Sequence, residues 1–107
     1  MEELLSDASK RAIRYLESLG ERRVFPSPEA RQRLAKLEFD FPDRPTSPEQ
    51  VLVTLDELGS PAAVASAGGR YFGFVTGGSL PATVAAGWLA SAWDQNMYVS
   101  VMSPVGA

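Results

Sequence analysis

The residues best placed for chemistry lie in the glycine-rich stretch Thr76-Gly77-Gly78-Ser79, directly before an apolar segment. Free backbone N–H groups at the start of a helix, together with the helix dipole, favour a bound phosphate or carboxylate. No Gly-Lys-Ser/Thr sequence follows, so the stretch is not the phosphate loop of a nucleoside triphosphatase. A tight turn that requires positive φ at glycine explains the same residues and is the commoner use of such a sequence.

Two neighbouring groups of residues offer weaker chemistry. Tyr71, Phe72 and Phe74 could form the wall of a ligand site, although packing into a core is the commoner fate of such rings. Asp94-Gln95-Asn96 holds one carboxylate and two amides, which is a poor ligand set for Mg²⁺ or Ca²⁺. We expect this triplet to end a helix through side-chain hydrogen bonds, and we predict no metal site.

The composition removes most catalytic chemistry from the chain. It has no histidine and no cysteine, which excludes Ser-His hydrolysis at Ser79, thiolate nucleophiles, disulfides and Cys-ligated zinc. Lys10 and Lys36 fall on the charged faces of amphipathic helices, away from the apolar setting that Schiff-base chemistry requires. We therefore predict no catalytic residue in this chain.

Helix signals recur through the first part of the sequence. Apolar residues at helical spacing predict an amphipathic helix that ends at Gly20: Leu5, Ala8, Ala12, Leu16 and Leu19. Ser-Pro-Glu at positions 27–29, and again at 47–49, supplies a capping serine, a first-turn proline and an acid for the helix dipole. Residues 39–46 predict an extended connector because they contain two prolines, and Gly59 is expected to end the third helix.

Charge is unevenly distributed along the chain, and residues 71–93 carry none. Glycines and Pro81 interrupt this run, and the helix expected over residues 82–93, with Ser79 as its cap, is too short to span a bilayer. A helix that is apolar all round is more often buried inside a larger protein or between subunits. We therefore expect protein beyond this chain, and no membrane, to cover residues 82–93.

The overall composition is that of one small globular domain or a piece of a larger one. Ten basic and thirteen acidic residues among 107 give a net charge of −3, which argues against a nucleic-acid partner. The acidic start of the chain lacks the apolar core of a secretory signal, so a cytoplasmic location is expected. Ser103-Pro104 has the form of a further helix start close to the last residue, from which we expect a truncated chain.

Four motifs follow one another over the last part of the sequence. They are Gly69-Arg70-Tyr71-Phe72-Gly73-Phe74-Val75-Thr76-Gly77-Gly78, Trp88-Leu89-Ala90-Ser91, Asp94-Gln95-Asn96-Met97-Tyr98 and Ser103-Pro104. In this order and spacing they resemble the group II pyridoxal-phosphate-dependent amino-acid decarboxylases, the relatives of the glutamate, tyrosine and aromatic amino-acid decarboxylases. Residues 47–52 and 63–66 are also similar to bacterial members of the family.

The resemblance implies a mainly α segment, the N-terminal helical arm of a fold-type I enzyme whose complete chain is an α/β protein. Residues 1–67 would form the arm, residues 68–79 a glycine-rich loop that lines the substrate pocket, and residues 80–107 an apolar helix leading into the large domain. Family members are homodimers with the active site at the subunit interface. The implied partners are therefore the rest of the enzyme and a second subunit.

The resemblance also implies substrate-binding residues. Phe74, Val75 and Thr76 match the segment that lines the substrate pocket, with Thr76 making a polar contact and Phe74 shaping the side-chain pocket. Tyr98 lies near the position that reaches towards the active site of the partner subunit. Glutamate-specific members carry an amide where Phe74 stands, so an aromatic or other apolar amino acid is the expected substrate.

The implied cofactor is pyridoxal phosphate, bound by the complete enzyme and not by this segment. The family's Schiff-base lysine, cofactor-stacking histidine and pyridinium-pairing aspartate lie beyond Ala107, so we expect no cofactor-binding residue here. Two other interpretations remain open. One is a stand-alone helical module that dimerises through residues 80–93, and the other is a piece of a related pyridoxal-phosphate lyase or aldehyde-forming enzyme.

Overall fold

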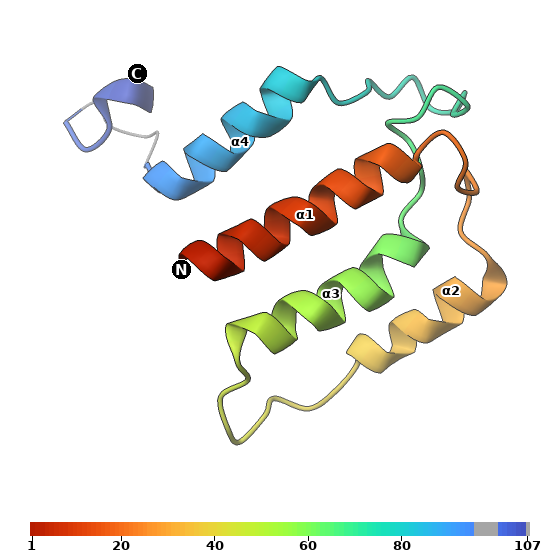
Figure 1. Cartoon of the computed structure of the whole chain (residues 1–107), viewed down its shortest axis with the longest axis horizontal. Coiled ribbons are helices and arrows are strands. Elements are labelled where there is room, and N and C mark those ends of the chain that lie inside the picture. Colours follow the sequence, from red (N-terminus) through yellow and green to blue (C-terminus); the bar gives the residue numbers. More distant parts are fainter. Residues whose placement is uncertain (96–100, 107) are drawn as a thin grey trace. The chain divides into compact units, whose positions relative to one another are not determined.

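The computed structural model describes residues 1–95 and 101–106, and its regular elements are helices. In chain order these are α1 (Glu2–Ser18), α2 (Pro28–Arg33), the 3₁₀ helix η1 (Leu34–Leu37), α3 (Pro48–Ala62), α4 (Pro81–Trp93) and the 3₁₀ helix η2 (Pro104–Gly106) (Figure 1). No strand occurs among the described residues, so the prediction of a mainly α segment is confirmed. Within these ranges, none of the helices combines the length and the apolar character of a membrane span. The chain divides into two compact units, Met1–Thr76 and Gly77–Ala107.

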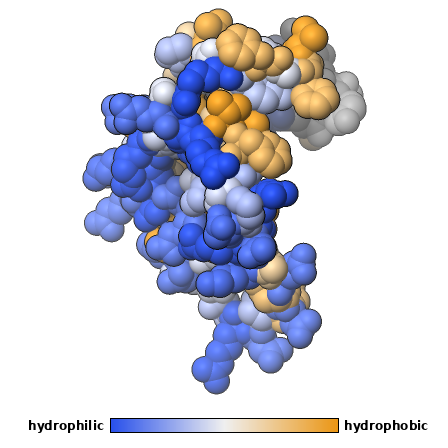
Figure 2. All heavy atoms as spheres, turned by 90° about the vertical axis from the view of Figure 1, so that its right-hand side faces the viewer, coloured by the Kyte–Doolittle hydropathy of each residue, from blue (hydrophilic) through white to orange (hydrophobic). Residues whose placement is uncertain are grey.

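In the first unit, α3 lies between α1 on one side and α2 on the other, and it also contacts η1 (Figure 1). The buried core is small: its buried residues are Pro26, Leu58 and Ala65. Apolar side chains such as Leu5 and Ile13 of α1 stay about half exposed. On the face that Figure 2 shows, hydrophobic side chains gather near the top, and most of the remaining surface is hydrophilic. Because so little apolar surface is buried, polar contacts must contribute much of what holds α3 in place.

Helices α2 and α3 begin as their Ser-Pro-Glu sequences predict. The Ser27 hydroxyl accepts a hydrogen bond from the backbone N–H of Ala30 at 3.1 Å, and Ser47 accepts one from Gln50 at 3.2 Å. Proline follows each serine in the first turn, where its missing N–H would have no helical partner anyway. Both predicted caps are confirmed.

Replacing Ser47 with alanine is expected to lower the free energy of unfolding by about 1 kcal/mol, because the cap bond to Gln50 is lost. Glycine at this position should cost only about a few tenths of a kcal/mol. Urea denaturation followed by circular dichroism measures both values. Thr46→Ala is the matched control, since Thr46 is an exposed neighbour outside the helix, and equal losses for Thr46→Ala and Ser47→Ala would contradict the cap.

The sequence predicted that α3 ends at Gly59, but the helix continues to Ala62 with Pro61 inside it. A glycine inside a helix costs only about 1 kcal/mol, and two contacts offset this by holding the last turn. The Ser60 hydroxyl donates to Asp56 Oδ1 at 2.6 Å, and the Arg22 guanidinium donates to the Ser60 carbonyl. The Ser60–Asp56 bond is local, but the contact with Arg22 joins residues 38 apart in the sequence, and the local pattern did not reveal it.

Two predicted helix ends also differ in detail. No glycine in the described part has positive φ, so Gly20 follows α1 without the left-handed conformation of a typical glycine cap. Instead the N–H groups of Glu21 and Arg22 donate to the Ser18 carbonyl. The cap of α4 is Leu80 and not Ser79, because Pro81 occupies the first helical position and keeps the residue before it extended.

The end of α4 matches the prediction made for residues 94–96. Asp94 adopts the left-handed conformation (φ 48°), and its N–H donates to the Ala90 carbonyl at 3.2 Å. The Gln95 side-chain amide donates to the Trp93 carbonyl at 2.7 Å. Aspartate is among the few residues that tolerate this backbone region. The prediction that these residues end the helix is confirmed, but the side-chain hydrogen bond comes from Gln95, whereas the bond of Asp94 is from its backbone N–H. Asn96 lies outside the described residues.

Candidate functional site

The loop that follows α3 is fixed at its base, which we define as residues 65–71. Ala65 is 1% exposed, and its N–H donates to the Val24 carbonyl at 2.9 Å. The Arg70 guanidinium donates to the carbonyl of Arg22, so two bonds tie the loop base to the segment after α1. A further backbone bond, from Tyr71 to Gly68 at 3.2 Å, closes the base into a turn. The loop therefore leaves the first unit from a fixed position.

Gly68 is closely packed at this base. A Cβ atom there would lie 3.3 Å from the carbonyl oxygens of both Leu19 and Ala65. Backbone atoms yield less readily than the end of a flexible side chain, so a larger residue must displace part of the base.

Gly68→Ala is expected to lower the free energy of unfolding by up to about 1 kcal/mol. This is the net effect: the close contact of the new Cβ destabilises the folded state, while the smaller conformational entropy of alanine in the unfolded chain partly offsets the loss. Gly69→Ala is the matched control, because a Cβ at Gly69 meets nothing within 4 Å and its φ is not positive. That variant should be neutral or stabilised by about 0.4–1 kcal/mol. Thermal denaturation of the two proteins compares them directly, and equal shifts would contradict the close contact.

The tip of the loop, residues 72–76, has the opposite character to its base. Phe72 and Phe74 are each 94% exposed, and Val75 is fully exposed. Thr76 is exposed as well. The prediction that the rings at 72 and 74 pack into a core is therefore wrong, because the small core of the unit does not reach the tip. Tyr71 is half-buried, and its ring lies beside Gly73.

The tip turns through an unusual backbone conformation. Positive φ was expected at the glycine pair 77–78, but Phe74 (φ 56°) and Val75 (φ 53°) adopt it instead. This region costs a non-glycine residue about 1–2 kcal/mol, and it is rarest for β-branched residues such as valine. The result is a strained turn that presents apolar side chains to the outside.

Three of the four predicted substrate-binding residues lie side by side in the chain at this tip. Phe74, Val75 and Thr76 form one continuous exposed segment. The fourth, Tyr98, lies outside the described residues. The tip by itself is an open surface, so any pocket that it lines needs walls from further protein.

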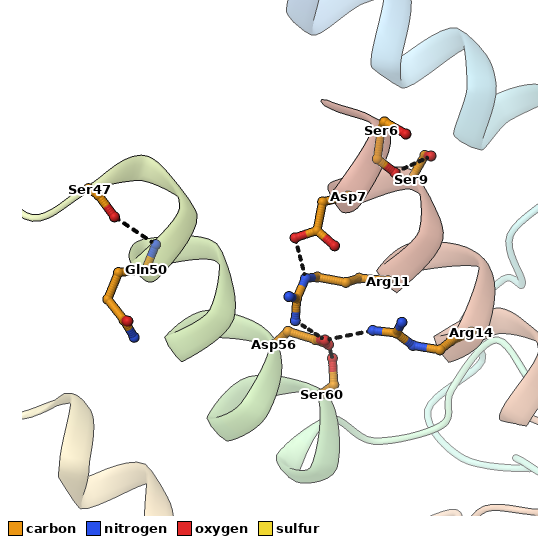
Figure 3. A network of polar contacts seen from close by, with 9 residues as sticks. All are labelled: Ser6, Asp7, Ser9, Arg11, Arg14, Ser47, Gln50, Asp56 and Ser60. Atoms are coloured by element: carbon orange, nitrogen blue, oxygen red, sulfur yellow. Dashed lines mark hydrogen bonds and ion pairs between the residues drawn. The ribbon is translucent and has the colours of Figure 1, made fainter. Parts of the chain in front are cut away.

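Sequence reasoning missed a cluster of polar residues between α1 and α3, made up of Asp7, Arg11, Arg14, Asp56 and Ser60 (Figure 3). Arg11 donates to Asp56 at 2.8 Å and to Asp7 at 2.9 Å, and Arg14 approaches Asp56 at 3.4 Å. The spacing of Asp7 and Arg11, and of Asp56 and Ser60, places each pair on one helix face. That spacing was visible in the sequence, but nothing in it showed that the two faces meet.

Asp56 is the electrostatic centre of this α1–α3 cluster. The hydrogen bond from Ser60, followed by the bond and charge of Arg11, holds the pKa of the Asp56 carboxyl below its usual value, although partial burial acts in the opposite direction. The hydrogen bonds that Arg11 donates to Asp7 and to Asp56 raise the pKa of Arg11. Asp56 therefore stays ionised and paired, and the hydrogen bonds and ion pairs of the α1–α3 cluster hold the two helices together.

Arg22 links the end of α3 to the loop base. Its guanidinium stacks over the Tyr15 ring, 4.4 Å from the ring centroid, while it donates to the Ser60 carbonyl at the end of α3. Lysine or arginine near the last carbonyls of a helix is favoured by the helix dipole. Because the carbonyl of Arg22 also accepts from Arg70, this one residue connects α1, α3 and the loop.

No buried lysine occurs among the described residues. Lys10 and Lys36 are both exposed, and Lys10 lies beside the acidic Glu2, Glu3 and Asp7 along an open pocket on α1. Groups of three or more metal-binding side chains are also absent from the described part.

Helix α4, in the second unit, is apolar and exposed. Trp88, Leu89 and Trp93 keep roughly half of their surface exposed, and Val84 is the only residue of this helix with intermediate burial. Large exposed apolar surfaces mark sites of interaction with other protein.

Fold and site together define a mainly α chain with an anchored loop, an exposed apolar loop tip and an exposed apolar helix. No protein-family model, no curated protein and no solved structure matches the chain. Its function is therefore proposed from its motifs and from these surfaces.

Proposed function

We propose that the chain is the N-terminal part of a cytoplasmic pyridoxal-phosphate-dependent L-amino-acid decarboxylase that acts on an aromatic or other apolar amino acid. The sequence support is the ordered set of motifs from Gly69 to Pro104. The observation that carries the proposal is the loop: a fixed base holds a strained tip whose apolar side chains are open to further protein. Backbone strain of this kind concentrates at functional loops.

In this proposal the chain supplies part of a pocket and part of a subunit interface. Phe74 and Val75 would form an apolar wall, and the Thr76 hydroxyl would make a polar contact to the substrate. The exposed apolar surface of α4 would be buried in the complete homodimer, as the cores of homodimer interfaces are rich in apolar side chains. When bound by the complete enzyme, pyridoxal phosphate would supply the electron sink for decarboxylation.

The first test is the intact mass of the native protein, taken with its visible absorbance and its release of carbon dioxide from apolar amino acids. A chain several times the 11.5 kDa of this sequence, with the absorbance of bound pyridoxal phosphate and with carbon dioxide release, supports the proposal. A colourless 11.5 kDa protein overturns it. Aldehyde in place of amine among the products would assign the chain to a related aldehyde-forming enzyme instead.

Thr76→Ala in the complete enzyme is expected to lower kcat/KM by roughly 2- to 10-fold, because one neutral hydrogen bond contributes about 0.5–1.5 kcal/mol. Thr76→Ser keeps the hydroxyl and is the matched control, with kcat/KM close to that of the wild type. Thermal denaturation should show no difference between the three proteins, since Thr76 is exposed at the loop tip. An unchanged kcat/KM for Thr76→Ala removes this residue from the substrate site.

A second candidate function rests on α4 alone. A thirteen-residue helix with no charged side chain and two exposed tryptophans suits a stand-alone module that dimerises through this helix. A stable, helical dimer of the 107-residue chain without cofactor would favour this function, and Trp88→Ser with Trp93→Ser should then shift the chain to a monomer in analytical ultracentrifugation.

A further inference from the structure

We draw no further inference here: the strongest candidate, the exposed apolar surface of α4 around Trp88, Leu89 and Trp93, belongs to the surfaces already described, and nothing in the described part of the chain shows what covers it.

Discussion

Replacing Asp56 with alanine is expected to lower the free energy of unfolding by about 1–3 kcal/mol, the range for losing hydrogen bonds to a charged group. The substitution removes the acceptor shared by Arg11, Arg14 and Ser60. It also leaves Arg11, whose side chain is 19% exposed, with Asp7 as its remaining acidic partner. Because the apolar core of this unit is small, little else holds α3 against α1.

Two further variants separate the charge of Asp56 from the general effect of losing an acid. Asp56→Asn keeps the size and one acceptor oxygen, so it should lose less stability than alanine. Asp43→Ala removes an exposed acid of the connector and should stay within about 0.5 kcal/mol of the wild type. Urea denaturation measures the stability of all three variants: a shifted midpoint with an unchanged slope of unfolding free energy against urea concentration reports a change in stability. Equal midpoints for Asp56→Ala and Asp43→Ala would show that the α1–α3 cluster contributes nothing.

The contribution of Asp56 should also depend on pH. Its pKa is lower in the folded chain than in the unfolded chain, where aspartate titrates at about 3.9, so ionisation favours the folded state. The stabilisation is complete above about pH 5 and is lost as the pH falls through the folded-state pKa. The stability difference between the wild type and Asp56→Asn should therefore shrink in acid. A difference that stays constant from pH 6 to pH 3 would contradict the lowered pKa.

Local features of the fold could be predicted from the sequence because local chemistry determines them. Ser27 and Ser47 cap their helices, since a hydroxyl before a first-turn proline has its N–H partner within three residues. Asp94 ends α4 for a similar reason, because its conformation and its hydrogen bond lie within one helical turn.

Features set by contacts between distant segments could not be predicted in this way. Gly59 is a reasonable place for α3 to end when the sequence is considered alone, but Arg22, 38 residues before Ser60, donates to the Ser60 carbonyl and holds the turn that follows Gly59. The exposure of the loop tip also depends on the whole unit, because a ring packs into a core only where enough other apolar residues meet. The candidate site residues come from motif order alone, which identifies positions in a sequence and says nothing of the pocket around them.

Replacing Phe74 with asparagine in the complete enzyme is expected to lower kcat/KM for an aromatic amino acid by roughly 10- to 200-fold, the range for losing apolar contacts in a pocket. The backbone makes asparagine a clean choice. Phe74 has a φ of 56°, and asparagine adopts this left-handed region more readily than phenylalanine. Strain in the loop therefore cannot account for a loss of activity in this variant.

Phe72→Asn is the matched control, because Phe72 is 94% exposed on the same loop tip but lies outside the segment assigned to the pocket. We expect its kcat/KM to stay within about 3-fold of the wild type, since surface substitutions away from a site have small effects. Phe74→Leu keeps an apolar side chain in the pocket wall, and its kcat/KM should lie between the values for Phe72→Asn and Phe74→Asn. Measuring kcat/KM of Phe74→Asn for one aromatic amino acid and for glutamate also shows whether the asparagine amide shifts the ratio of the two values in favour of glutamate. Equal losses for Phe72→Asn and Phe74→Asn would mean that both rings pack against neighbouring protein and that Phe74 does not select the substrate.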